Sequence, residues 1–190
     1  MNQNFTEGKY AGRKGFTLLE LVTVLAIAAV LVVWAFPSLI QSIQNNRVSS
    51  QNMSMMAMLS LTKSEAVRRN TSVTLTVEPN ADGGWDAIIE DPASEVEVEG
   101  CMPGQLRCSS NTGASVELCN QDDTCAGTFE LVFNNRGYLD PGDPVVWEAK
   151  TIFLQHESCA GQNQRTRIHI LPTGQIASCT LPCDSTAVCP

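Results

Sequence analysis

The segment from Phe16 to Phe36 constrains the fold of this chain most. It is apolar apart from two threonines and carries one charged side chain, Glu20, close to its start. As an α-helix it is long enough to cross a hydrocarbon core of about 30 Å. An ionised carboxylate inside that core costs about 2.5 to 3.5 kcal/mol on insertion scales. A simple anchor would gain nothing from such a charge, so we expect Glu20 to have a role of its own.

Charge is distributed unevenly around this segment. The residues before Phe16 include Lys9, Arg13 and Lys14 but a single acidic residue, Glu7. Basic flanks stay in the cytoplasm, which predicts that the C-terminal part is exported. Three of the 12 basic and one of the 20 acidic residues lie in this leader, so the remainder is strongly acidic. That balance disfavours a general nucleic-acid surface, because phosphate binding needs a basic patch.

The cysteines indicate the compartment. All eight lie beyond the apolar segment: Cys101, Cys108, Cys119, Cys125, Cys159, Cys179, Cys183 and Cys189. An even number on one side of a membrane span predicts disulfides in an oxidising space. Zinc is the alternative, but no CxxC pair occurs and the two histidines form no ligand pair with Cys179 and Cys183. The connectivity is open; we expect sequence-local pairs, together with Cys159 bonded to Cys179.

The helix is expected to continue beyond the apolar segment. Pro37 removes one backbone hydrogen bond and would bend the helix rather than end it. Apolar side chains then recur at roughly helical spacing as far as Arg69. They are Ile40, Ile43, Val48, Met55, Met56, Leu59, Ala66 and Val67. We therefore expect one helix from Phe16 to about Arg69, whose second half packs on the domain that follows.

After Asn70 the sequence pattern changes to that of strands. Alternating residues predict a hairpin of Ser72–Val77 and Trp85–Glu90 around a Gly-rich turn. Further strands are expected within 128–134, 145–155, 165–172 and 174–179. The predicted fold class is α+β, with a long N-terminal α-helix packed on a C-terminal antiparallel β-domain that forms two sheets or one curled sheet.

The start of the apolar segment matches a known processing signal. Lys14 to Glu20, KGFTLLE, followed by the apolar run, resembles the class III leader of type IV pilins and type II secretion pseudopilins. The resemblance implies that prepilin peptidase cleaves after Gly15 and that the new N-terminal Phe16 is N-methylated. It also implies that Glu20, the fifth mature residue, pairs with the N-terminal amine of a neighbouring subunit during assembly. The alternative is that Glu20 only complements the N-terminal dipole of the helix.

The resemblance extends over most of the chain. The segments FPSLIQSIQNNRVSSQ, LTKSEAVRRNTSVTLTV, FELVFNNRGYL and RIHILPTGQIASC follow the order seen in the FimU/FimT minor pilins and the H pseudopilin (GspH). The implied organisation is a leader (1–15), a transmembrane helix half (16–37), an amphipathic helix half (38–70) and a disulfide-bonded β-rich domain (71–190). The acidic, Cys-rich insert 91–125 and the tail after Cys179 are less typical, and no role is assigned to them.

This resemblance implies a minor type IV pilin, a structural subunit near the tip that supports assembly and links to the main fibre. Glu20 and Pro37 would be its assembly residues. Its partners would be major and minor pilins, prepilin peptidase and the inner-membrane assembly platform. The chain would reside in the inner membrane with a periplasmic C-terminal domain, and then in the fibre. No enzymatic activity, cofactor or metal is expected. The alternatives are an H-type pseudopilin of type II secretion and a DNA-binding minor pilin for natural transformation.

The DNA-binding alternative depends on basic residues near the C-terminus. The Gly-Arg-x-Arg motif of FimT-like proteins aligns with 174–177, where both arginines are missing. Arg165 and Arg167 lie nearby at alternate positions and would share one face of a strand. They are weak candidates, because two arginines in so acidic a domain more often belong to a solvated face.

Other candidate sites are weaker. His156 and His169 lack a nucleophile and an acid at motif spacing, so triad chemistry is not favoured. The segments 119–125 and 140–144 offer oxygen ligands for calcium but do not fit EF-hand spacing. Asn134–Gly137, NNRG, is typical of a β-turn rather than a catalytic loop.

Overall fold

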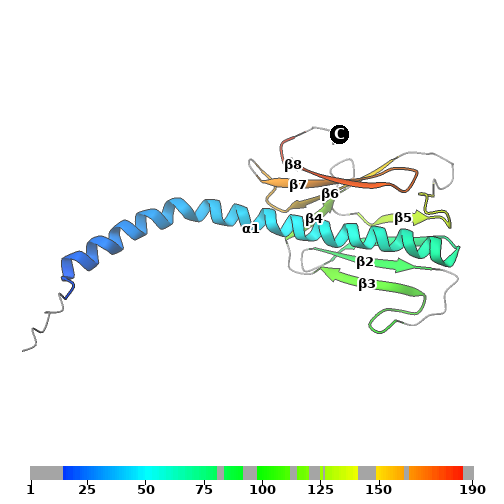
Figure 1. Cartoon of the computed structure of the whole chain (residues 1–190), viewed down its shortest axis with the longest axis horizontal. Coiled ribbons are helices and arrows are strands. Elements are labelled where there is room, and N and C mark those ends of the chain that lie inside the picture. Colours follow the sequence, from blue (N-terminus) through cyan, green and yellow to red (C-terminus); the bar gives the residue numbers. More distant parts are fainter. Residues whose placement is uncertain are drawn as a thin grey trace, which may run out of the picture. The chain divides into compact units, whose positions relative to one another are not determined.

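The structure is a computed structural model that describes residues 15–80, 84–91, 98–111, 115–119, 125, 127–140, 149–160 and 163–185. In this part of the chain there are one helix and eight strands (Figure 1). They are α1 (Leu18–Arg69), β1 (Val73–Pro79), β2 (Trp85–Glu90), β3 (Gln105–Asn111), β4 (Val116–Cys119), β5 (Phe129–Phe133), β6 (Lys150–His156), β7 (Gln164–Ile170) and β8 (Ile176–Pro182). The chain divides into two compact units, Met1–Ile40 and Gln41–Pro190.

Both ends of α1 are closed by local sequence signals. At its start, the backbone N–H of Glu20 donates to Thr17 Oγ1 at 3.2 Å, so Thr17 is the N-cap. At its end, Asn70 adopts a left-handed conformation with φ of 56°, and the N–H of Thr71 reaches back to the carbonyl of Ala66. This is the arrangement of a Schellman cap, with asparagine in place of glycine. The helix therefore ends where the sequence predicts, and it continues through Pro37.

The buried stripe of α1 differs in part from the predicted one. Val48, Met55, Leu59 and Ala66 are buried as expected, and Met58 and Thr62 join them. Three predicted members, Ile40, Ile43 and Val67, are instead largely exposed. Thr62 can be buried because its hydroxyl donates to the carbonyl of Met58 at 2.7 Å, which satisfies the polar group inside the helix. Hydrophobicity alone therefore assigned to the stripe three residues that the domain does not cover.

The strands form two four-stranded sheets with the orders β3-β2-β1-β5 and β4-β6-β7-β8. Every pairing between neighbours is antiparallel, which confirms the predicted fold class. In Figure 1, β2 and β3 lie on one side of α1 and β6, β7 and β8 on the other. The predicted hairpin is present, with β1 extended to Pro79. Strands β3 and β4 were not predicted; they lie inside the insert 91–125 and add one edge to each sheet.

The core lies between the two sheets and the second half of α1. On β1, the alternate residues Val73, Leu75 and Val77 are fully buried, as a strand with one face on the core requires. Trp85 of β2 and Phe133 of β5 are the largest fully buried side chains. Fully burying one large apolar side chain contributes about 1.5 to 3 kcal/mol, so this core holds the helix half and both sheets together.

Near the C-terminal end of α1, a turn that follows one sheet packs against a turn of the other sheet. The predicted turn at Asn134–Gly137 is confirmed, because Gly137 donates to the carbonyl of Asn134 at 2.8 Å. The β7–β8 turn packs against it, and a Cβ atom on Gly174, which has φ of 72°, would collide with the Gly137 carbonyl oxygen. Lys63 Nζ donates to the Gly174 carbonyl at 2.8 Å. Glycine is therefore required at position 174 both for its conformation and for this close approach.

Candidate assembly site

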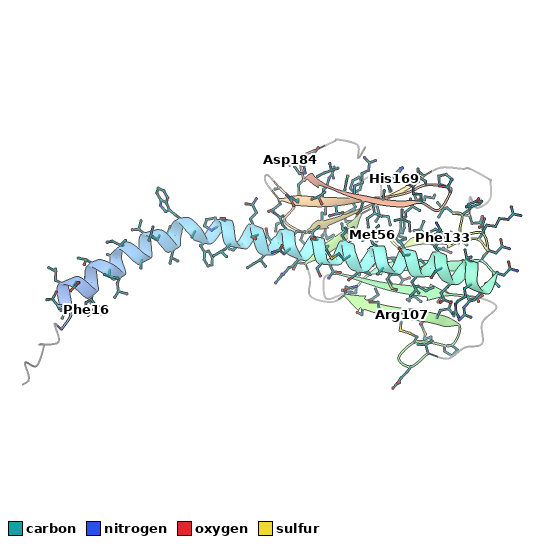
Figure 2. The ribbon with its side chains drawn as sticks, in the orientation of Figure 1. Phe16, Met56, Arg107, Phe133, His169 and Asp184 are labelled. Carbon is teal, nitrogen blue, oxygen red and sulfur yellow. A yellow bond between two sulfur atoms is a disulfide. The ribbon has the colours of Figure 1, made fainter. Side chains whose placement is uncertain are left out.

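The predicted cleavage junction is accessible. Gly15 and Phe16 precede the helix without regular structure, and the side chain of Phe16 is 81% exposed at the start of α1 (Figure 2). Apart from Gly15 and its chain neighbours, no described residue has an atom within 4 Å of the position that a Cβ on Gly15 would occupy. The predicted leader before Gly15 lies outside the described residues, so cleavage after Gly15 and methylation of Phe16 stay predictions.

Glu20 lies in the first turn of α1. Its backbone N–H is capped by Thr17, whereas its carboxylate makes no ion pair or hydrogen bond with the residues that the structure describes. A negative charge in the first helical turn is favoured by the helix dipole, which is the alternative interpretation of Glu20. Thr17 was not singled out from the sequence, although Thr-x-x-Glu before an apolar run is the spacing of a capping box.

The apolar half of α1 has the length and composition of a membrane span. Its best 18-residue window has a mean hydropathy of 2.6, and no residue of that window is buried within the chain. Trp34, near the end of the span, is 83% exposed. Soluble monomers rarely expose apolar patches of more than a few hundred Å². This surface therefore requires lipid or other protein segments around it, in agreement with membrane anchoring.

Disulfides stabilise the C-terminal unit. The described pairs are Cys101–Cys108, Cys119–Cys125 and Cys159–Cys183, and Cys179 is also disulfide-bonded. Cys189 lies outside the described residues. The first two pairs are sequence-local, as expected.

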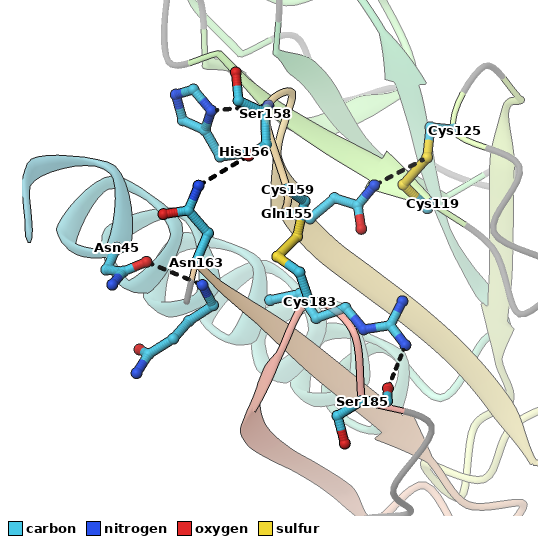
Figure 3. Close-up of a disulfide and its surroundings, with 12 residues drawn as sticks. Asn45, Cys119, Cys125, Gln155, His156, Ser158, Cys159, Asn163, Cys183 and Ser185 are labelled. Atoms are coloured by element: carbon cyan, nitrogen blue, oxygen red, sulfur yellow. Dashed lines mark hydrogen bonds between the residues drawn. A yellow bond between two sulfur atoms is a disulfide. The ribbon is translucent and has the colours of Figure 1, made fainter. Parts of the chain in front are cut away.

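The predicted pairing of Cys159 with Cys179 is wrong. Cys183 lies at the open end of the β7–β8 hairpin, where its N–H donates to the carbonyl of Asn163 at 3.0 Å, and Cys159 reaches it there (Figure 3). Cys179 is four residues further back along β8, a displacement of about 13 Å at the rise of a strand. Because a disulfide needs the two Cα atoms within about 7 Å, Cys159 bonds to Cys183.

Potential metal ligands come together at one place in the described residues. Ligand atoms of Glu117, Cys119 and Cys125 lie within 4.8 Å of one another. The two sulfur atoms are bonded to each other, so neither can act as a thiolate ligand. This group is therefore a disulfide beside a carboxylate rather than a metal centre. Most of the segments 119–125 and 140–144, considered for calcium, lies outside the described residues.

Arg165 and Arg167 lie on one face of β7, as their alternate positions predict. Their guanidinium groups lie over the ring of Phe153 in β6, at 4.6 and 5.5 Å from its centroid, and leave that ring only 6% exposed. Arg165 also donates to the carbonyl of Ser185 at 2.8 Å (Figure 3). Cation–π contacts of this kind contribute about 0.5 to 2 kcal/mol. Both arginines therefore cover an aromatic side chain, and Arg165 also holds the segment after β8.

The two histidines make separate local contacts. His169 Nδ1 lies 3.1 Å from the hydroxyl of Thr151, its partner across β6 and β7. His156 Nδ1 accepts the N–H of Ser158 at 3.1 Å. Because His156 lies five residues along β6 from Thr151, the imidazoles occupy opposite ends of the ladder. The structure does not bring them together.

A 52-residue N-terminal helix and an antiparallel β-domain define a pilin-like fold. The minor pilin FimU of Pseudomonas aeruginosa PAO1 has this fold; the two structures share a TM-score of 0.51 and 18% identity, over 70% of this chain and 89% of the chain in the FimU crystal structure. Residues 10–36 match the prokaryotic N-terminal methylation motif, and residues 51–174 match the type II transport protein GspH family. The chain belongs to that family. Over 135 residues it is also 30% identical to the pilin-like protein PilA1 of Thermus thermophilus, covering 70% of this chain and 82% of PilA1.

Proposed function

We propose that this protein is a minor type IV pilin, a structural subunit that is processed after Gly15, anchored by the apolar half of α1 and incorporated into a fibre. One combination of features carries the proposal. An N-terminal methylation motif leads into an exposed apolar helix, and the same chain continues into a GspH-family domain. Soluble domains need no such helix, and a simple membrane anchor needs no methylation motif.

Glu20 would select the place at which the subunit docks. Its carboxylate lies one turn from the mature N-terminus and has no partner in the described part of the chain. A protonated N-terminal amine of a neighbouring mature subunit would neutralise it. Pairing offsets a membrane cost of about 2.5 to 3.5 kcal/mol, while a misplaced subunit would leave the charge unpaired. Pro37 would loosen the backbone ladder at the end of the span and let α1 adapt to its neighbours.

In this proposal residues 1–15 are the leader, 16–37 the transmembrane half, 38–70 the domain-bound half and 71–190 the periplasmic domain. The partners are prepilin peptidase, the inner-membrane assembly platform and other pilins. Resemblance to FimU-type minor pilins supports a position near the tip, where the subunit would join an initiating complex to the main fibre. The subunit would move from the inner membrane to the fibre, with its domain on the periplasmic side.

An H-type pseudopilin of type II secretion is the second candidate, and the family match itself favours it, because that family is described by its role in type II transport. Both candidates use the same leader and helix. They differ in where the assembled fibre ends, since a pilus extends from the cell surface and a pseudopilus stays in the periplasm. Fractionation of the cells therefore separates them.

The experiment is mass spectrometry of fibres sheared from cells that produce the full chain. The expected species begins at N-methylated Phe16 and is present in the sheared fraction. Gly15→Glu is the matched control: it should leave an uncut precursor in the inner membrane and no chain in the fibres. A mature form that begins elsewhere would refute the assignment. Correct processing with retention in the periplasm, together with a secretion defect on deletion, would favour the pseudopilin.

A further inference from the structure

Three of the four edge strands are protected against pairing with another chain. The β3 edge carries Arg107 (Figure 2) and has a bulge in its pairing with β2. Strand β4 has four residues and carries Glu117. Strand β5 carries Glu130, and its outer side is bridged by Leu139. Charged side chains, bulges, short length and coverage are the usual means of blocking a sheet edge.

Among the described residues, strand β8 has none of these protections in its first half. It is seven residues long, IASCTLP, without a charged side chain, and it pairs with β7 without a register shift. Within the described part of the chain, no strand pairs with the outer side of Ile176–Ser178. An uncharged, regular edge of this kind is a template for another strand.

The hydrogen-bond pattern shows which backbone groups face outward. In the β7–β8 turn the N–H of Leu171 donates to the carbonyl of Gln175 at 2.9 Å. Antiparallel pairs alternate between hydrogen-bonded and non-hydrogen-bonded. Counting from this bond, Ile176 and Ser178 are in non-hydrogen-bonded pairs with β7, so their N–H and C=O groups point away from it. Ala177 lies between them in a hydrogen-bonded pair.

An apolar groove adjoins the same edge. It has a volume of about 760 Å³ and lies between α1 and the start of β8, with Met56, Ser60 and Val67 on the helix side and Ile176 on the strand side. Lys63 lines it too, and its described hydrogen bond goes to a neutral carbonyl, which leaves a positive charge at the groove. A strand added to β8 would lie about 4.8 Å beyond it, so alternate side chains would point toward this groove.

We propose that Ile176–Ser178 accepts an extended segment from the globular domain of another pilin subunit, which adds a strand to the β4-β6-β7-β8 sheet. Main-chain hydrogen bonds to Ile176 and Ser178 would give affinity, and an apolar side chain in the groove would give selectivity. A neighbouring carboxylate on that segment would meet Lys63. The identity of the partner rests on the proposed function; the strand edge and the groove do not.

Ser178→Pro tests the added strand. Proline removes an N–H that points away from β7 and places its ring toward the incoming segment, and the ladder to β7 is kept. Ser178→Ala is the matched control, because both variants lose the 3.4 Å contact from Asn52 Nδ2 to Ser178 Oγ. The full chain is produced in cells, and its amount in sheared fibres is measured. Loss of the main-chain bond from this N–H should reduce incorporation of Ser178→Pro about tenfold, and Ser178→Ala should incorporate like the wild type.

A photoreactive phenylalanine analogue at Gln175 provides a second measurement that does not depend on the proline variant folding. Gln175 is exposed and lines the groove. Illumination of cells should cross-link it to a peptide from the globular domain of a pilin subunit, identified by mass spectrometry. Cross-linking to a pilin N-terminal helix or to nucleic acid, or no cross-link, would overturn the proposal.

The outcomes also separate this inference from the proposed function. If Ser178→Pro folds and incorporates as well as Ser178→Ala, strand addition is overturned, while wild-type chain in the fibres still supports the minor pilin. If the wild type itself never enters sheared fibres, the proposed function fails. The Gln175 cross-link then decides the strand proposal on its own, since a periplasmic pseudopilin partner would still be captured.

Discussion

Removal of the Cys159–Cys183 disulfide should destabilise the C-terminal unit more than removal of a local one. The bond joins residues 24 positions apart and encloses β7 and β8, whereas Cys101 and Cys108 are 7 positions apart. Loop-closure entropy gives about 3.4 kcal/mol for the longer loop and about 2.4 kcal/mol for the shorter one. The double variant Cys159→Ala/Cys183→Ala should therefore lose about 1 kcal/mol more than Cys101→Ala/Cys108→Ala.

The two double variants can be compared by guanidinium unfolding of the full chain in detergent. Trp85 is a suitable reporter, because it is fully buried in β2 and belongs to neither loop. The other two of the three tryptophans would be replaced by phenylalanine in every sample. Linear extrapolation then gives the free energy of unfolding for each variant.

Two results would refute this reasoning. If both double variants lose the same free energy, loop length does not govern the stabilisation. If the Cys101–Cys108 variant loses more, the bond near β3 must support native contacts rather than restrict the unfolded chain. A lower m value in one variant would instead indicate residual structure in its unfolded state, and the comparison would then be repeated by hydrogen exchange of β8.

Glu20→Ala should still be cleaved and held in the membrane but should be lost from sheared fibres; normal incorporation, measured by immunoblot, would leave only the dipole role. Arg165→Ala with Arg167→Ala should lower the melting temperature by exposing Phe153, without changing retention of DNA on a filter; a marked loss of DNA retention would revive the DNA-binding alternative. Hydrogen bonds from Arg68, and then from Arg69, outweigh burial and hold the pKa of Glu65 below its ordinary value of 4.5. Its stabilisation should be present above about pH 4.5 and be lost as the pH falls through the folded-state pKa, so Glu65→Gln should flatten the dependence of the melting temperature on pH below about pH 4.5.

The parts of the fold that could be predicted are those with a local signal. The end of α1 follows from Asn70 and from the change of apolar period after it, and β1 follows from its strict alternation. Strands β3 and β4 were missed for a physical reason. QLRCSSN is mostly polar and VELC is short, so each is a strand only because a neighbouring strand offers hydrogen bonds. Edge strands of this kind are determined by tertiary structure, and no sequence window contains that information.

The residues of the candidate site also differ in whether a local sequence signal identifies them. Glu20 and Gly15 are visible in the sequence because the leader motif is contiguous. The shared face of Arg165 and Arg167 follows from alternation alone, but their position over Phe153 depends on the register of β6 against β7. The Cys159–Cys183 bond likewise depends on where the β7–β8 hairpin opens. Contacts between segments far apart in sequence need a strand register, which depends on turn geometry and on how the buried faces of the two strands match, and a local sequence window shows neither.

Strand β8 combines an unprotected edge with firm support at both ends. At one end the turn is held by the Lys63 hydrogen bond and by the close packing of Gly174 on Gly137. At the other end the Cys159–Cys183 bond closes the hairpin. A strand fixed in this way has little conformational entropy left to lose when another segment pairs with it, and preorganisation of that kind increases affinity. The turn contacts and the disulfide that restrict β8 therefore also prepare Ile176–Ser178 to accept a strand. Loosening either end of β8 should weaken docking even where the rest of the domain stays folded.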